Sequence, residues 1–214
     1  MTARALPAAG APAAHGLNWE NINWSQVKSN VRRLQMRIAK AYREEKSGRV
    51  KALQWLLTHS HEAKLLAVKR VTENRGAKTP GVDNEVWRTA RQKMEAVSTL
   101  KRHGYQPQPL RRIYIPKKEP GKYRPLSIPA MVCRAQQALH LLALEPITET
   151  MADKHAYGFR PYRSTADAIE QCFKLLARKS AARYILEGDI KSCFGAPGKA
   201  WCFQRVQFPS LERA

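Results

Sequence analysis

Residues 111–129 read RRIYIPKKEPGKYRPLSIP, and this stretch decides the fold class. Side chains over residues 111–115 alternate between two faces, which is typical of a β-strand. Pro120-Gly121 predicts a turn, and residues 123–128 return as a second strand. Prolines in and beside both strands exclude a central place in a sheet. We therefore expect a β-hairpin at the edge of a sheet.

The tip and flanks of this predicted hairpin are strongly basic. Residues 105–135 contain seven Lys and Arg against one acidic residue. A basic hairpin can close over a triphosphate or a template, although lysines on an edge strand can also serve only to prevent aggregation. The concentration of cations favours the functional interpretation. The residues concerned are Lys117, Lys118, Lys122 and Arg124, with Arg111 and Arg112 as candidate RNA contacts.

Helical periodicity precedes the hairpin. Apolar residues recur at steps of three and four from Val27 to Ala41, on one face of a helix that Asn23 caps and that ends near Ser47-Gly48. Arg32, Arg33, Arg37 and Lys40 mostly lie away from this face. Such a basic surface suits a sugar-phosphate backbone, but a merely solvated helical hairpin fits the segment equally well.

Further elements complete an α+β pattern. We expect a second helix over residues 49–71, and a type II turn at Pro80-Gly81 with the glycine at positive φ. A third helix, capped by Asp83, should close at His103-Gly104. The last elements are a helix from 130 to about 144 that Pro146 breaks or kinks, a helix capped by Ser164 and Asp167, and a strand over 183–190.

The composition points to a polyanionic partner. Thirty-eight Lys and Arg against 17 Asp and Glu give the 214 residues a net charge of +21, concentrated before residue 136. Residues 1–17 predict a disordered leader rather than a signal peptide, and no apolar run is long enough to span a membrane. Four cysteines without a CxxC pair argue against zinc and disulfides, so we expect a cytoplasmic protein.

At residues 111–129 the sequence resembles the group II intron reverse transcriptase/maturase family, and the match extends in both directions along the chain. The similar segments are TPGVDNEVW (79–87), the hairpin (111–129), ALEPITET (143–150), AYGFRPYRSTADAI (156–169) and ILEGDIKSCF (185–194), in the family's order. The resemblance covers residues 19–194. It implies the fingers and an incomplete palm of a right-hand polymerase fold. The expected units are a leader (1–17), a basic helical region (18–104), fingers with the start of the palm (105–194) and an unrelated tail (195–214).

The resemblance also implies roles for individual residues. Lys117 and Arg124 match the pair that grips the triphosphate of a dNTP, although a loop one residue longer than usual leaves Lys118 as an alternative to Lys117. Asp189 matches the first catalytic carboxylate, which binds Mg²⁺ together with the carbonyl of Ile190. Phe194 matches the aromatic beneath the sugar, whereas without the resemblance a plain core Phe is the better interpretation. The implied partners are group II intron RNA and an RNA–DNA hybrid.

The implied catalytic site is only half present. The family supplies its other carboxylates from a Tyr-x-Asp-Asp turn, and the 214 residues contain no Asp-Asp pair. Gly195 stands where the family has Asp, and residues 195–214 match nothing in it. We therefore expect a truncated reverse transcriptase that is inactive as a polymerase, its gene altered by a frameshift or rearrangement. The alternatives are an RNA-binding maturase fragment without catalysis, or a non-functional product of a decayed mobile element.

Overall fold

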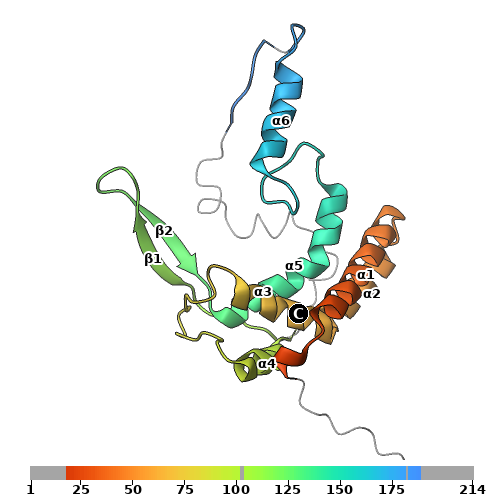
Figure 1. The fold of residues 1–214 in the computed structure, drawn as a ribbon, viewed down its shortest axis with the longest axis vertical. Helices are drawn as coiled ribbons and strands as arrows, with labels where there is room; N and C mark the ends of the chain where they lie inside the picture. The colour runs from red at the N-terminus through yellow and green to blue at the C-terminus, as the bar shows by residue number, and fades with distance from the viewer. Residues whose placement is uncertain (1–17, 102–103, 182, 189–214) are drawn as a thin grey trace, which may run out of the picture.

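The computed structural model describes residues 18–101, 104–181 and 183–188 (Figure 1). In chain order the elements are the 3₁₀ helix η1 (Trp19–Asn21), α1 (Trp24–Arg43), α2 (Ser47–His59), α3 (His61–Glu73), α4 (Ala90–Thr99), β1 (Arg111–Pro116), β2 (Tyr123–Ile128), α5 (Met131–Met151) and α6 (Thr165–Leu176). The described part is thus α+β, as the sequence predicts. None of the helices in these ranges combines the length and the hydropathy required to traverse a bilayer.

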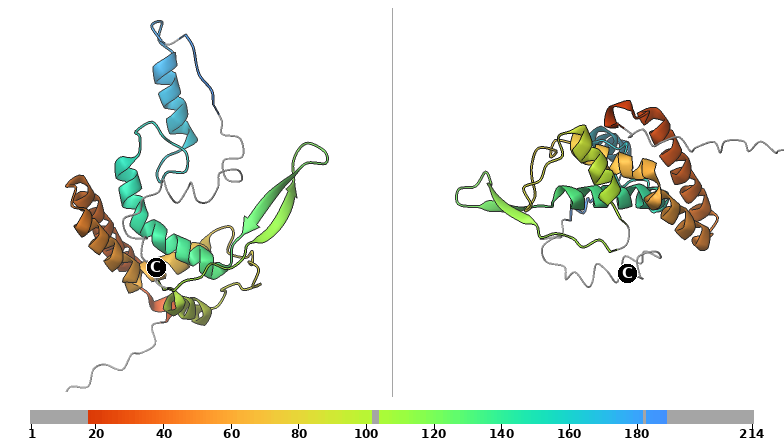
Figure 2. Two further views of the ribbon diagram at one scale, coloured as in Figure 1. Left: turned by 180° about the vertical axis from the view of Figure 1, so that it is seen from behind. Right: turned by 90° about the horizontal axis from the view of Figure 1, so that it is seen from below.

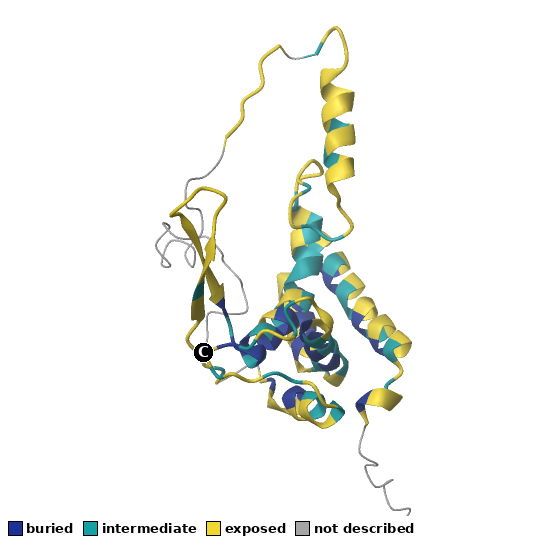
Figure 3. Cartoon of the chain, turned by 60° about the vertical axis from the view of Figure 1, so that its left-hand side comes forward, coloured by how far each residue is buried: buried dark blue, intermediate teal, exposed yellow. Residues whose placement is uncertain are grey.

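The hydrophobic core lies among four helices. Helices α1, α2 and α3 pack against one another and against α5, and α4 packs against α3 and η1. Ile38 of α1, Leu57 of α2 and Val68 of α3 are fully buried, as are Met131 and Leu139 of α5. Figure 3 shows this burial concentrated where the helices meet. Each such aliphatic side chain contributes about 1.5–3 kcal/mol by leaving water.

Helix α1 forms with the predicted face inward but ends earlier than predicted. Val31 and Ile38 are buried, and the Asn23 side chain accepts a hydrogen bond from the Gln26 backbone N–H at 3.1 Å. The helix stops at Arg43, and Ser47 begins α2 instead of ending α1. Glu45 reverses the chain between them with a φ of 54°.

The predicted helix over 49–71 is two helices. Ser60 takes an extended conformation between α2 and α3, and its hydroxyl accepts a hydrogen bond from the Ala63 backbone N–H at 3.2 Å. Serine is a strong N-cap, so its bond to the backbone starts a new helix where the apolar pattern alone predicted continuity.

Helix α4 begins later and ends earlier than predicted. Thr89, not Asp83, is its cap, and Thr89 forms a reciprocal capping box with Gln92. The Asp83 carboxylate accepts a hydrogen bond from the Glu85 backbone N–H at 3.2 Å. The helix ends at Thr99, before the predicted stop at His103-Gly104.

Helix α5 continues through Pro146 to Met151, so of the predicted break or kink, the break does not occur. Proline has no N–H to donate to the carbonyl four residues earlier, which is that of Leu142. The Gln35 side chain of α1 donates to this carbonyl at 2.9 Å. A neighbouring helix thus supplies the hydrogen bond that the proline removes.

The described residues from α6 to residue 188 are mostly exposed to solvent. The Ser164–Asp167 capping box forms at the start of α6 as predicted, but α6 has no buried residue. Residues 184–188 form no strand, because no second strand lies beside them within the described ranges. Tyr184 and Leu186 are more than nine-tenths exposed. The predicted strand over 183–190 is therefore wrong over its described part.

Candidate nucleic-acid interface

The predicted hairpin forms and projects from the helices (Figures 1 and 2). Ile115 lies opposite Arg124, and the Lys117 backbone N–H donates to the Lys122 carbonyl at 2.8 Å. Side chains two apart on a strand share a face, so Lys117 lies on the face of Ile115 and Arg124. The structure therefore brings Lys117 and Arg124 to one face near the hairpin tip.

The charges at this tip are not equivalent. Lys122 forms an ion pair with Glu119. No carboxylate in the described part of the chain pairs with Lys117, Lys118 or Arg124, and all three are exposed. Unpaired cations keep their full charge for an anionic ligand. Arg111 and Arg112, at the base of β1, are likewise exposed and unpaired within the same ranges.

Arg134 anchors the base of the hairpin. Its guanidinium donates to the carbonyls of Pro129, Gly76 and Thr79 at 2.8, 2.9 and 2.6 Å. Burial lowers the pKa of Arg134, and the charge of Asp83 partly opposes this shift. This arginine therefore holds the chain after β2 to the loop after α3. The sequence contains no local signal for this role, because two of the three carbonyls, those of Gly76 and Thr79, are 58 and 55 residues away.

The candidate RNA-binding residues of α1 are all exposed. Arg32, Arg33, Arg37 and Lys40 lie away from the buried face, as predicted. Lys40 lies 3.9 Å from the Glu44 carboxylate, and Arg33 donates to the Asn30 side chain. Among the described residues, Arg32 and Arg37 have no hydrogen-bond or ion-pair partner.

Two of these four residues line a shallow cavity, and the other two do not. It has a volume of about 330 Å³ and lies between α1 and the start of α3, where Arg33 and Arg37 line it together with Ser60 and Glu62. Glu62 accepts a hydrogen bond from the Asn30 side chain at 3.4 Å. The cavity is therefore mixed in charge, and Arg32 and Lys40 lie outside its lining.

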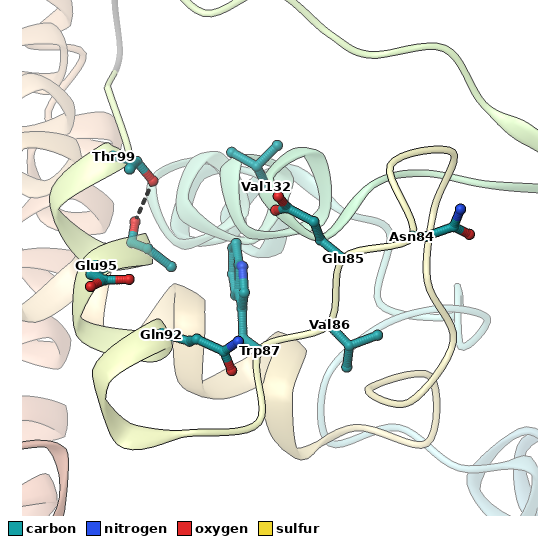
Figure 4. Close-up of a pocket in the computed structure, with 9 residues that line it drawn as sticks. Asn84, Glu85, Val86, Trp87, Gln92, Glu95, Thr99 and Val132 are labelled. Carbon is teal, nitrogen blue, oxygen red and sulfur yellow. Dashed lines mark hydrogen bonds between the residues drawn. The ribbon is translucent and has the colours of Figure 1, made fainter.

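A larger cavity of about 600 Å³ lies beside α4 (Figure 4). The carboxylates of Glu85 and Glu95 line it together with Trp87 and Val132. None of its lining residues is Lys or Arg, and like charges repel, so this cavity is unsuited to a triphosphate.

The segment around Arg160 serves the fold. Its guanidinium donates twice to the Glu149 carboxylate, at 3.1 and 2.8 Å, and also to the carbonyls of Asp153 and Ala156. The hydrogen bond from Arg160 lowers the pKa of Glu149. Phe159 and Tyr162, on either side, have positive φ values and exposed rings.

The predicted catalytic residues Asp189, Ile190 and Phe194 lie outside the described residues. Within the described ranges, no group of three or more His, Cys, Asp or Glu residues is arranged to hold a metal ion. The predicted metal ligands rest on the sequence.

Comparison with known proteins gives matches over most of the chain. Residues 19–100 match the N-terminal domain of reverse transcriptase, and residues 115–196 match reverse transcriptase (RNA-dependent DNA polymerase). Protein YkfC of Escherichia coli K12 is 38% identical over 173 residues, which are 77% of this chain and 44% of that protein. Group II intron-encoded protein LtrA of Lactococcus lactis is 37% identical over 132 residues, which are 60% of this chain and 21% of LtrA.

These matches define the class of protein. A match to the N-terminal domain of reverse transcriptase is followed in the same chain by a match to reverse transcriptase itself, and the α+β fold with its basic hairpin agrees with both. The chain is therefore a reverse transcriptase by descent. It belongs to the group II intron reverse transcriptase/maturase family, since the intron-encoded protein LtrA matches it over 60% of its residues. The chain spans less than half the length of these relatives.

Proposed function

We propose that this chain is the RNA-binding and nucleotide-gripping part of a group II intron reverse transcriptase/maturase. The observation that supports this most directly is the unpaired, exposed charge on two separate elements, the hairpin and α1. Cations that lie close together without an anionic ligand destabilise the folded chain, because like charges repel one another. The proposed division remains a basic helical region (18–104) followed by fingers and the start of the palm (105–194), in the cytoplasm.

The hairpin is proposed to hold the triphosphate of a dNTP. Lys117 supplies a compact cation and Arg124 a planar fork, on the same face. Together they would neutralise charge that develops on the phosphates during transfer. Phe194 is proposed to lie beneath the sugar and reject a 2′-hydroxyl.

The proposed metal is Mg²⁺, with the Asp189 carboxylate and the Ile190 carbonyl as its ligands. Oxygen donors suit this ion, but two ions require several oxygens each. The 214 residues contain no Asp-Asp pair to complete such a centre. We therefore propose that these residues alone do not catalyse RNA-directed DNA synthesis.

The proposed RNA partner is group II intron RNA, and an RNA–DNA hybrid is a further ligand of the hairpin. Arg32, Arg33, Arg37 and Lys40 would contact phosphates from α1, and Arg111 and Arg112 from the hairpin base. Contacts of this kind release counterions, so the affinity falls steeply as salt rises. They carry little sequence information by themselves.

Two measurements on the purified chain test this proposal. Filter binding of a group II intron RNA at increasing salt should show a steep loss of affinity, and an affinity independent of salt would contradict the proposal. Primer extension on an RNA template with Mg²⁺ and dNTPs should give no product. A product would show that the chain is an active polymerase, which is the second candidate function that its family supports.

A further inference from the structure

Two aromatic rings stack on the exposed side of α2. The ring centroids of Trp55 and His59 lie 4.2 Å apart, with an angle of 24° between the ring planes. Trp55 has 49% of its surface exposed to solvent, and His59 is exposed as well. The two residues are one helical turn apart, so both rings lie on one face of the helix.

This ring pair is held in place before any ligand arrives. The Nδ1 atom of His59 lies 2.8 Å from the Trp55 carbonyl oxygen. A carbonyl oxygen only accepts, so Nδ1 is the donor and carries a hydrogen. The helix beneath is fixed in turn, because the buried Gln54 side chain donates to the Ala143 carbonyl of α5 at 3.0 Å. Neither ring therefore has to be ordered on binding.

The surroundings of the pair are basic. Helix α2 contains Arg49 and Lys51 and no acidic residue. Lys51 lies one turn before Trp55 and so shares its face. It is exposed, and no described carboxylate pairs with it. A base stacking on the rings would thus find a cation within reach of its phosphate.

The other described tryptophans are covered more completely. Trp19 is only 7% exposed, and the Lys69 ammonium covers the Trp24 ring at 4.3 Å from its centroid. Trp87 is half-buried and lines the cavity beside α4. Trp55 is therefore the described tryptophan that presents most ring surface to solvent, and it does so beside a second ring and a cation.

We propose that Trp55 and His59 form a stacking platform for an unpaired base of RNA, with Lys51 contacting the adjoining phosphate. Aromatic rings bind single-stranded bases by stacking, and they cannot do so when the bases are stacked within a duplex. The proposal rests on the proposed function, since it assumes that the chain binds RNA. It adds to that function a preference for single-stranded over double-stranded RNA.

The test compares a 12-nucleotide single-stranded RNA with a duplex of the same length, by fluorescence anisotropy with the full chain. Replacement Trp55→Leu keeps an apolar side chain and removes the ring. It should weaken single-strand binding by about 5- to 100-fold, the range for loss of one stacked base, and leave duplex binding unchanged. Trp55→Phe should restore most of the affinity, and Leu56→Ala, at a neighbouring exposed position, should have no effect.

Equal single-strand affinity of Trp55→Leu and the unaltered chain would overturn the platform while leaving the proposed function intact. An equal loss for single strand and duplex would overturn it as well. If the unaltered chain bound neither RNA, the proposed function and the platform would both fail. Circular dichroism checks that Trp55→Leu is folded. His59→Ala, which removes only an exposed ring, should weaken single-strand binding in the same direction and provides the test if Trp55→Leu unfolds.

Discussion

The backbone of Gly81 lies directly against that of Ala130. A Cβ atom on Gly81 would stand 2.4 Å from the Ala130 Cα and 2.6 Å from its nitrogen. Gly81 does not take the positive φ that a type II turn requires, so the sequence prediction for this glycine is wrong. Its lack of a side chain is needed for close approach instead. The contact joins the loop after α3 to the start of α5, where the hairpin returns to the core.

We expect Gly81→Ala to destabilise the fold by about 1–3 kcal/mol, because the added methyl group would meet backbone that cannot move aside freely. Urea unfolding followed by circular dichroism measures the change. Gly48→Ala in α2 is the matched control, since nothing lies within 4 Å of its added Cβ. It should stabilise slightly or have no effect. Equal stability of Gly81→Ala and the unaltered chain would show that the two segments separate easily.

Arg134→Lys should loosen the same junction. Lysine keeps the charge but has no planar fork to reach three carbonyls, so the part-buried hydrogen bonds to Pro129 and Gly76 would be lost at a cost of about 1 kcal/mol each. Limited proteolysis should then cut the loop after α3 faster. Arg75→Lys, in the same loop and exposed, is the control and should behave like the unaltered chain. Identical cleavage rates for both variants would contradict the anchoring role.

The Glu149–Arg160 pair should make stability depend on acid pH. The hydrogen bond from Arg160 lowers the pKa of Glu149 below its ordinary 4.5 in the folded chain. The pair therefore stabilises the fold fully above that ordinary value, and this stabilisation is lost as the pH falls through the lowered pKa. The Tm difference between the unaltered chain and Glu149→Gln should shrink in acid. Glu170→Gln, which loses only an exposed pair with Lys174, is the control.

Hairpin variants should separate the candidate triphosphate contacts. Arg124→Ala and Lys117→Ala should each weaken binding of a dNTP, measured by equilibrium dialysis, by about 10- to 150-fold, since a charge-assisted contact contributes about 1.5–3 kcal/mol. Neither should change the Tm, because both side chains are exposed. Lys122→Ala is the control, because Lys122 already pairs with Glu119. A larger loss for Lys118→Ala than for Lys117→Ala would assign the role to Lys118.

The basic face of α1 should govern the salt dependence of RNA binding. Replacing Arg32, Arg33 and Arg37 together with Ala removes three phosphate contacts and should reduce the slope of log K against log salt by about 2–3. Replacing the exposed Arg75, Arg88 and Lys101 lowers the net charge equally and should leave the slope nearly unchanged. An unchanged slope in the first variant would show that the RNA contacts lie elsewhere.

The catalytic half of the candidate site remains a sequence prediction. Asp189, Ile190 and Phe194 lie outside the described residues, and the match to reverse transcriptase over residues 115–196 supports their roles without testing them. The placement of both Lys117 and Arg124 near the hairpin tip, by contrast, follows from the strand pairing and from the Lys117–Lys122 backbone hydrogen bond. The stacked pair of Trp55 and His59 was not predicted, although their spacing of four on a predicted helix is a signal that could have found it.

The sequence by itself determined the local structure of this protein. The period-two alternation and the Pro120-Gly121 turn set the hairpin, and the Ser164–Asp167 box set the start of α6, because these depend on neighbours in the chain. The tertiary structure decided those features that depend on contacts between residues far apart in the sequence. Gln35 donates to Leu142, so α5 passes through Pro146, and the approach of Ala130 makes Gly81 necessary. Such contacts join residues far apart in sequence, and no local pattern encodes which partner will arrive.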